Sequence, residues 1–451
     1  MNKLVGVIKK HLTGRGRSAT VKKNIFASFM IKGLSILISL MLVPVTIGYV
    51  SAELYGVWLS LSSMVHMMHF MDLGFSQGLK NKLVEAIAKE DWTRGKSLVS
   101  TTYMMVSFVF IPVCIVLQFV LPLINWCNLL NISAQYSDDI LRVLRVLVVF
   151  MCVHMIVNVL TNVVAAFQRV AFSSLFSVIG QVLSFVIIVI MTKTMPPSLM
   201  GLAFAYSAVP VIVFIVASVI LYSGQYKMIA PNVKTFDRAL LKDIFNLGIK
   251  FFILNIQVVV IFQSTNILIS HVSSPLQVTS YNVAYKYIHV AMMAYLIIVA
   301  PLWPAYSDAY VRQDFDWMRR MRNKMAKILL LSITAIAGMV VISPFVYHFW
   351  IGDKAEVPFI MTCLVGIYVS MYCSMNLNGY LLSGMGKIQL STIMSCGGMI
   401  LHIPLSLFLS RYIGAYGVIS SMIFITLVYA VVFHIQVNKI LSNTAKGIWL
   451  Q

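Results

Sequence analysis

Long apolar stretches separated by short polar segments run through almost the whole chain, and each is close to the ~20 residues that an α-helix needs to cross a bilayer. About 12 such stretches can be delimited. They are residues 25–49, 55–75, 99–124, 140–167, 171–192, 199–222, 247–271, 280–306, 326–349, 357–382, 389–410 and 416–438. Because helices satisfy their backbone hydrogen bonds within one segment, the pattern predicts an all-α polytopic membrane protein. A mean hydropathy of +0.89 with 11% charged residues excludes a soluble fold.

Lys and Arg lie almost entirely on one side of this predicted topology. With the N-terminus in the cytoplasm, the outside loops contain Lys193, Lys354 and Arg411. Five basic residues lie within the predicted helices: Lys32, Arg142, Arg145, Lys250 and Lys286. The rest of the 34 Lys and Arg lie in, or at the edge of, an inside segment. Because basic loops resist translocation, both termini are predicted to be cytoplasmic, and the net charge of +20 reflects topology rather than binding to nucleic acid.

The predicted helices divide into two sets of six. The organisation is a basic N-terminal tail (1–24), an N-lobe (25–222), a cytoplasmic linker (223–246), a C-lobe (247–438) and a C-terminal tail (439–451). A weak internal echo supports two parallel halves, because SAELYGVW at 51–58 and PLQVTSYN at 275–282 each lead into the second helix of a lobe. Transporters are often built this way, with the substrate path between the halves. The inside loops 76–98, 223–246 and 307–325 are expected to lie as amphipathic helices on the membrane surface.

Polar residues within the membrane recur at steps of 3, 4 or 7 in the first two helices of each lobe, so each set shares a helix face. The four sets are Ser28, Lys32, Ser35, Ser39 and Thr46; Ser62, His66, His69, Asp72 and Ser76; Asn246, Lys250, Gln257 and Ser264; and Thr279, Asn282, Lys286 and His289. Stripes at corresponding places in two halves predict that all four face one aqueous cavity.

The charges of that cavity are predicted to be positive. Lys32 and Lys286 lie too deep to be helix-end anchors, and a buried Lys costs roughly 2.5–3.5 kcal/mol unless it faces a cavity or a partner. A structural pair with a neighbouring helix is the alternative for both. Lys250 lies nearer the inner end of its helix and snorkelling is an alternative. Carboxylates lie at the inner ends of helices, where Asp72 and Asp308 are interpreted as an inner gate. Such a cavity suits a phosphate or pyrophosphate head group.

The remaining candidates have weaker functional interpretations. Arg142 and Arg145 stand near an outer helix end as possible cations of the path, although Arg142 can instead pair with Asp138 or Asp139. His66 and His69 are interpreted as neutral cavity-lining side chains, with proton coupling as the alternative. The abundant Met and aromatic residues, Phe above all, are interpreted as packing and lipid-facing residues. Neither a metal site nor a cofactor is predicted, and the absence of a nucleotide-binding or catalytic motif argues against a pump or an enzyme.

Several sequence words at the helix ends resemble a known family. They are DLGFSQGLKNKL from Asp72, PLWPAYSDAY at 301–310 followed by Asp314 and Trp317, NGYLLSGMGK at 378–387, and Pro404 with Gly414 and Gly417. Together they resemble the Wzx-type O-antigen and polysaccharide flippases of the multidrug/oligosaccharidyl-lipid/polysaccharide exporter superfamily. The similarity runs over about residues 24–438.

The resemblance implies a V-shaped bundle of two six-helix lobes around a central cationic cavity. It implies movement of undecaprenyl-pyrophosphate-linked sugar repeat units between the leaflets of a bacterial inner membrane by alternating access. The lipid tail is expected to stay in the bilayer, and a polysaccharide polymerase and a chain-length regulator are candidate partners. A drug or small-molecule antiporter on the same fold is the alternative, although such antiporters usually carry acidic cavity residues. A membrane polymerase or acyltransferase is disfavoured by the short outer loops.

Overall fold

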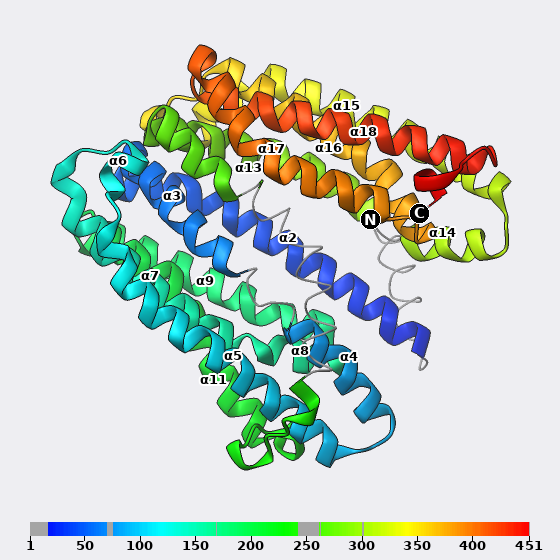
Figure 1. Ribbon diagram of the computed structural model, residues 1–451. Helices are drawn as coiled ribbons and strands as arrows, with labels where there is room; N and C mark the ends of the chain where they lie inside the picture. Colours follow the sequence, from blue (N-terminus) through cyan, green and yellow to red (C-terminus); the bar gives the residue numbers. More distant parts are fainter. Residues whose placement is uncertain are drawn as a thin grey trace, which may run out of the picture. The chain divides into compact units, whose positions relative to one another are not determined.

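The computed structural model describes residues 17–69, 75–167, 169–241, 261, 263–299 and 302–450, and there the chain folds into helices joined by short turns (Figure 1). The first half contains α2 (Arg17–Val50), α3 (Ala52–His69), α4 (Phe75–Ala88), α5 (Trp92–Val120), α6 (Trp126–Leu130), α7 (Ser137–Val157), α8 (Val159–Ala166), α9 (Val170–Thr194), α10 (Leu199–Ala203) and α11 (Val209–Ser223). The second contains α13 (Pro275–Val299), α14 (Leu302–Val311), α15 (Phe315–Trp350), α16 (Phe359–Met385), α17 (Gln389–Ile413) and α18 (Ala415–Leu441). Residues 263–272 are also helical.

The predicted fold class, an all-helical membrane protein, is confirmed. Within the described ranges, 10 helices are long and apolar enough to cross a membrane. The two other predicted spans are those at 55–75 and 247–271. The first corresponds to α3, which ends just before the undescribed residues 70–74, and most of the second lies in residues 242–260, outside the described part of the chain.

The same connection between a short helix and a long one occurs twice, 223 residues apart. Glu90 (φ 55°) and Gln313 (φ 58°) adopt a left-handed conformation that ends α4 and α14. The next residue, Asp91 or Asp314, caps the following helix by accepting a hydrogen bond from the backbone N–H three residues on, at 2.9 Å in both cases. An Asp at this position satisfies one of the unpaired N–H groups of a helix start. The repetition indicates two structurally related halves.

The chain divides into two compact units. The first comprises residues 1–49, 65–125 and 135–255, and the second comprises 50–64, 126–134 and 256–451. In the first unit α5 packs against α4 and α7, and α9 packs against α8 and α11. The predicted lobe and linker boundaries stay predictions, because the segment from 242 to 260 is outside the described residues.

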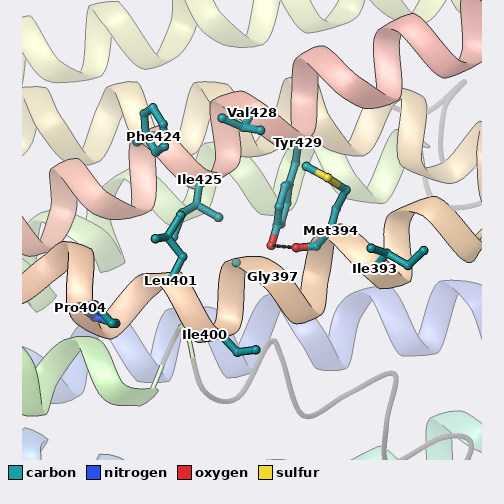
Figure 2. A pocket seen from close by; sticks show the side chains of 11 residues that line it. Ile393, Met394, Gly397, Ile400, Leu401, Pro404, Phe424, Ile425, Val428 and Tyr429 are labelled. Atoms are coloured by element: carbon teal, nitrogen blue, oxygen red, sulfur yellow. Dashed lines mark hydrogen bonds between the residues drawn. The ribbon is translucent and has the colours of Figure 1, made fainter.

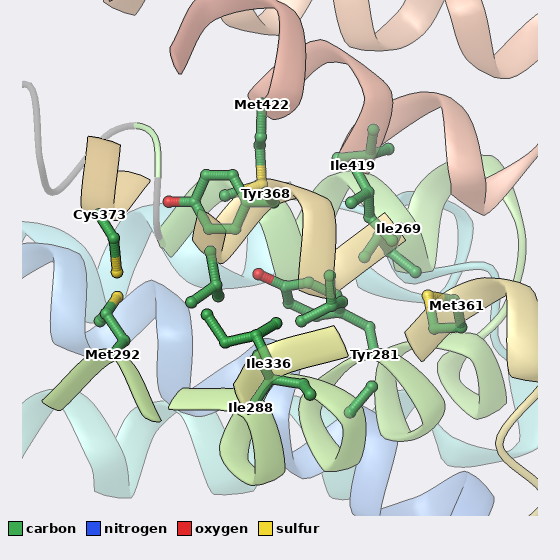
Figure 3. Close-up of a cluster of buried hydrophobic side chains, with 14 of the residues drawn as sticks. Ile269, Tyr281, Ile288, Met292, Ile336, Met361, Tyr368, Cys373, Ile419 and Met422 are labelled. Atoms are coloured by element: carbon green, nitrogen blue, oxygen red, sulfur yellow. The ribbon is translucent and has the colours of Figure 1, made fainter. Parts of the chain in front are cut away.

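Helix α16 is the centre of the second unit, where it packs against α13, α14, α15 and α18. The core that they share is built from Ile, Val, Met and Tyr side chains (Figure 3). Dispersion contacts and close packing hold such helices together in lipid, where burial of apolar surface gives little driving force. Residues 52–64 of α3 belong to the same unit.

Gly56 allows α3 to approach α13 very closely. A Cβ atom at this position would lie 1.7 Å from the backbone oxygen of Pro275, so any other side chain would force the backbones apart. A hydrogen bond of 2.6 Å from Thr279 Oγ1 to the Ala52 carbonyl joins the same two helices. Small residues at helix crossings serve this purpose in membrane proteins generally. The close crossing determines which side chains of α3 and α13 meet further along.

Two of the predicted inside loops are largely helical. Residues 76–98 contain most of α4 and the start of α5, and residues 307–325 contain the end of α14 and the start of α15. The expected helix in 76–98 is present, and its position on the membrane surface stays a prediction. In the third loop, 223–246, the expectation is wrong for residues 224–238, which form turns and two short 3-10 segments. The long helix α15 begins at Phe315, 11 residues before the predicted span, because Asp314 caps it there while the apolar pattern starts later.

Candidate functional site

A cluster of amide and hydroxyl side chains lies inside the second unit where α3 meets the helix 263–272 and α13. Asn266 Nδ2 donates a hydrogen bond to Ser63 Oγ at 2.6 Å, and Asn266 Oδ1 accepts one from Asn282 Nδ2 at 2.7 Å. The hydroxyl of Ser60 also donates to the backbone oxygen of Asn266 at 3.4 Å. Asn282 was predicted from the sequence as a cavity-lining residue, whereas its partner Asn266 was not. The cluster therefore connects residues more than 200 positions apart.

Lys286 lies one helical turn beyond Asn282 on α13. It is half-buried, and its Nζ donates to the phenol oxygen of Tyr55 on α3 at 3.4 Å. Its own helix contains no Asp or Glu. The phenol is a neutral partner, so this hydrogen bond does not cancel the positive charge of the ammonium group. His289 follows on the same face, with its ring 5.2 Å from that of Tyr285.

The predicted stripe of the first unit lies on α2. Lys32 is exposed, whereas Ser35 and Ser39 are half-buried. Ser35 Oγ donates to Gln181 Oε1 on α9 at 2.6 Å. Helix α2 contains no Asp or Glu, so Lys32 has no acidic partner within its own helix. The structure thus places one predicted cation in each unit on a helix without carboxylates.

The other predicted residues lie apart from these two groups. Arg142 and Arg145 are exposed on α7, and Arg142 forms an ion pair with Asp139 at 3.5 Å, as its alternative interpretation expected. Asp308 is exposed on α14 and pairs with Arg312 at 3.0 Å, one turn along its own helix. Its role as a gate stays a prediction. His66 and His69 lie in the last part of α3. Three further predicted residues, Asp72, Lys250 and Gln257, are outside the described residues.

A second polar cluster at the end of α18 was missed by the sequence reasoning. Arg322 on α15 is half-buried and donates hydrogen bonds to Asn438 Oδ1 and to His434 Nδ1. Arg319, one turn earlier, bonds both Asp316 and the backbone oxygen of Leu441. The sequence assigned both arginines to an inside loop. The arrangement ties α15 to the end of α18.

A pocket of about 610 Å³ between α17 and α18 is almost entirely apolar (Figure 2). It is lined by Ile393, Met394, Gly397, Gly398, Ile400, Leu401, Pro404, Phe424, Ile425, Val428 and Tyr429. The hydroxyl of Tyr429 is satisfied by the Met394 carbonyl at 2.7 Å. A groove of this composition suits hydrocarbon and offers no group for chemistry.

These features suit binding rather than covalent catalysis. In the second unit, the cluster of Ser63, Asn266 and Asn282 supplies neutral hydrogen-bonding groups and Lys286 supplies positive charge. In the first unit, Lys32 supplies positive charge on α2. In the described part of the chain, no group of three His, Cys, Asp or Glu side chains is placed to hold a metal.

Solved structures of three transporters resemble this chain over nearly its whole length. An inward-facing multidrug resistance MATE family transporter of the MOP superfamily has a TM-score of 0.78 and 15% identity, covering 93% of this chain and 98% of its own. An outward-facing transporter of that family scores 0.64 at 15% identity, covering 97% and 98%. A MOP superfamily transporter from Pyrococcus furiosus, described by a binding pocket of reverse polarity, scores 0.65 at 15% identity, covering 97% and 98%. No curated protein matches the sequence.

The chain is thus a multi-pass membrane protein with a MATE-like fold. The family model of polysaccharide biosynthesis proteins matches residues 21–310. Because this match covers more than half of the chain, the protein belongs to the polysaccharide biosynthesis protein family.

Proposed function

We propose that the protein is a flippase for undecaprenyl-pyrophosphate-linked oligosaccharide repeat units. In this proposal it moves them from the cytoplasmic to the periplasmic leaflet of a bacterial inner membrane by alternating access, with both termini in the cytoplasm. The distribution of Lys and Arg supports this orientation. Membership of the polysaccharide biosynthesis family supports a saccharide-bearing substrate.

The observation that carries the proposal is the environment of Lys286. Its ammonium group is hydrogen-bonded to a phenol, and Lys286 lies one helical turn from Asn282 of the amide cluster, on a helix without carboxylates. A pyrophosphate entering there meets a cation and several hydrogen-bond donors, which compensate for the water it loses. A lipophilic cation meets repulsion that is only weakly screened at low dielectric. The charge therefore favours a flippase over a drug antiporter.

The test is transport by purified protein in liposomes. We expect Lys286→Glu and Lys32→Glu to slow translocation of the lipid-linked repeat unit by at least tenfold, since a charge-assisted hydrogen bond contributes roughly 1.5–3 kcal/mol. Lys286→Arg retains the charge and much of the rate. Lys193→Glu is the matched control, because Lys193 is exposed at the end of α9.

Two results would count against the proposal. One is wild-type transport by Lys286→Glu, which would remove this residue from the path. The other is saturable ethidium transport with no translocation of the lipid-linked sugar, which would assign the protein to the antiporters.

A further inference from the structure

Tyrosine side chains form two ladders on the neighbouring helices α13 and α16. On α13, Tyr281 and Tyr285 are four residues apart, and on α16 Tyr368 and Tyr372 repeat the same spacing. Four residues is close to one helical turn, so each pair lies on one helix face. His289 continues the first ladder by another turn, and Tyr380 continues the second by two. We call these five side chains the tyrosine ladders: Tyr281, Tyr285, Tyr368, Tyr372 and Tyr380.

The rings within each ladder contact one another. Tyr281 and Tyr285 are stacked, with centroids 5.8 Å apart and planes 24° apart, and Tyr368 and Tyr372 have centroids 6.2 Å apart. Tyr281 and Tyr368 belong to the same core cluster, and in Figure 3 their hydroxyls point to the same side. The half-buried Tyr285, Tyr372 and Tyr380 pack against this cluster as well. The two ladders therefore form a single aromatic surface.

Exposure changes along that surface. The first ring of each ladder is buried, since Tyr281 is 4% exposed and Tyr368 2%. The later rings, Tyr285, Tyr372 and Tyr380, keep part of their surface open. Tyr281 and Tyr368 thus anchor the surface in the core, and the rings that follow leave part of their area accessible.

Tyrosine is concentrated on these two helices. The ladder residues Tyr281, Tyr285, Tyr368, Tyr372 and Tyr380 lie on α13 and α16, whereas α9 contains no Tyr and α17 contains Tyr412 alone. A phenol hydroxyl facing hydrocarbon is costly, so packing against lipid would favour Phe or Leu. Rings with an apolar face and a polar edge suit a ligand that has both kinds of surface.

Lys286 directly follows Tyr285, and this connects the ladders to the proposed pyrophosphate site. A sugar joined to a pyrophosphate at Lys286 lies within reach of the neighbouring rings. The C–H face of a pyranose ring is apolar and packs on an aromatic face, while its hydroxyls bond to polar edges and amides. A sugar-free polyprenyl pyrophosphate has no sugar ring to stack on these rings, and its tail is expected to stay in the bilayer.

We propose that the tyrosine ladders of α13 and α16 are a saccharide-binding surface that stacks against the sugar rings of the lipid-linked repeat unit. The inference rests on the proposed flippase function and assigns to this surface the preference for a lipid that carries sugar. Tyr285 and Tyr372 make the central contacts, and Lys286 binds the pyrophosphate.

The experiment measures binding of two probes by the purified full-length protein. One is undecaprenyl pyrophosphate, and the other is the same lipid carrying the repeat unit, isolated from the source bacterium. The ratio of the two affinities reports the contribution of the sugar. We expect the wild-type protein to bind the sugar-bearing lipid more tightly. Tyr285→Leu and Tyr372→Leu each reduce the ratio about three- to tenfold, the range of one aromatic contact.

Substitution by Phe distinguishes the contribution of the tyrosine ring to sugar binding from that of its hydroxyl. Tyr285→Phe and Tyr372→Phe keep the ring and are expected to retain most of the ratio. Tyr287 provides the matched control on the same helix, because its hydroxyl bonds the Met339 carbonyl of α15 at 3.1 Å and its ring packs edge-on against Tyr347. Tyr287→Leu leaves the ratio unchanged. If a Leu variant also loses binding of the sugar-free lipid, the same position is substituted by Met and measured again, since the flexible Met side chain fills the volume with less strain.

The outcomes separate the two proposals. If the wild-type protein binds neither lipid, the flippase function fails. If it binds both lipids equally, or if the Leu variants keep the wild-type ratio, the saccharide-binding surface is refuted while the flippase function stands. Saturable ethidium binding that the Leu variants abolish also overturns the inference, because the rings then act as a cation-binding cage.

Discussion

Replacement of Gly56 by Ala tests whether the close crossing of α3 and α13 holds the polar site together. The added Cβ would lie 1.7 Å from the Pro275 oxygen, whereas real Cβ contacts essentially never fall below 3.0 Å, so the helices must separate by about 1.3 Å. A rigid shift of that size lengthens the Thr279–Ala52 hydrogen bond from 2.6 Å to about 3.9 Å. It lengthens the Lys286–Tyr55 contact from 3.4 Å to about 4.7 Å. Neither distance is then a hydrogen bond.

The cost follows from these changes. Overpacking costs about 1–3 kcal/mol. Loss of the neutral Thr279–Ala52 hydrogen bond adds about 0.5–1.5 kcal/mol, and loss of the charged Lys286–Tyr55 hydrogen bond adds about 1.5–3 kcal/mol. The better helix propensity of Ala returns up to ~1 kcal/mol. We therefore expect Gly56→Ala to lower the free energy of unfolding by about 2–7 kcal/mol.

The measurement is unfolding of the purified protein in detergent micelles, by heat and by denaturant. Gly338→Ala is the matched control, because Gly338 lies within α15 of the same unit and has nothing within 4 Å of an added Cβ. The control is expected to be neutral or up to ~1 kcal/mol more stable. Equal stability of the two variants would refute the argument that α3 and α13 require a glycine.

Further substitutions test the other structural statements by the same unfolding measurements. Asp91→Ala and Asp314→Ala each remove a helix cap and are expected to cost about 1 kcal/mol; clearly unequal costs would contradict the equivalence of the two connections. Asn282→Leu leaves the buried oxygen of Asn266 without its donor and is expected to cost about 1–3 kcal/mol. Unchanged stability would show that the cluster is dispensable. Gly414 joins α17 to α18 at φ 56° and ψ −135°, so Gly414→Ala is expected to cost about 1–3 kcal/mol; a smaller loss would show that the turn relaxes.

The local features of the chain determined most of the helices. Apolar length predicts a spanning helix because lipid offers no hydrogen-bond partner to an open backbone. The start of α15 at Phe315 shows the limit of that rule, since the helix begins at the capping Asp314 and not where the apolar pattern begins. Caps and apolar runs are both local, so they can be read from neighbouring residues.

Part of the candidate site was also predictable from helical spacing. The step from Asn282 to Lys286 to His289 places all three on one face of α13 whatever the helix packs against. The i, i+4 tyrosine pairs carried the same kind of signal, but aromatic residues were interpreted as packing material. The pairing of two such ladders on α13 and α16 becomes visible when both helices are in place.

The tertiary structure decided which partner each of these residues meets. Tyr55 and Ser63 have ordinary positions in the sequence. Tyr55 reaches Lys286 because Gly56 allows α3 to approach α13, and Ser63 on the same helix meets Asn266. Helix formation depends on contacts within a few residues, so the sequence by itself determined the helices and the faces on which their polar groups lie. The choice of partner depends on close packing between segments more than 200 residues apart, and shape complementarity of that kind has no local periodic signal.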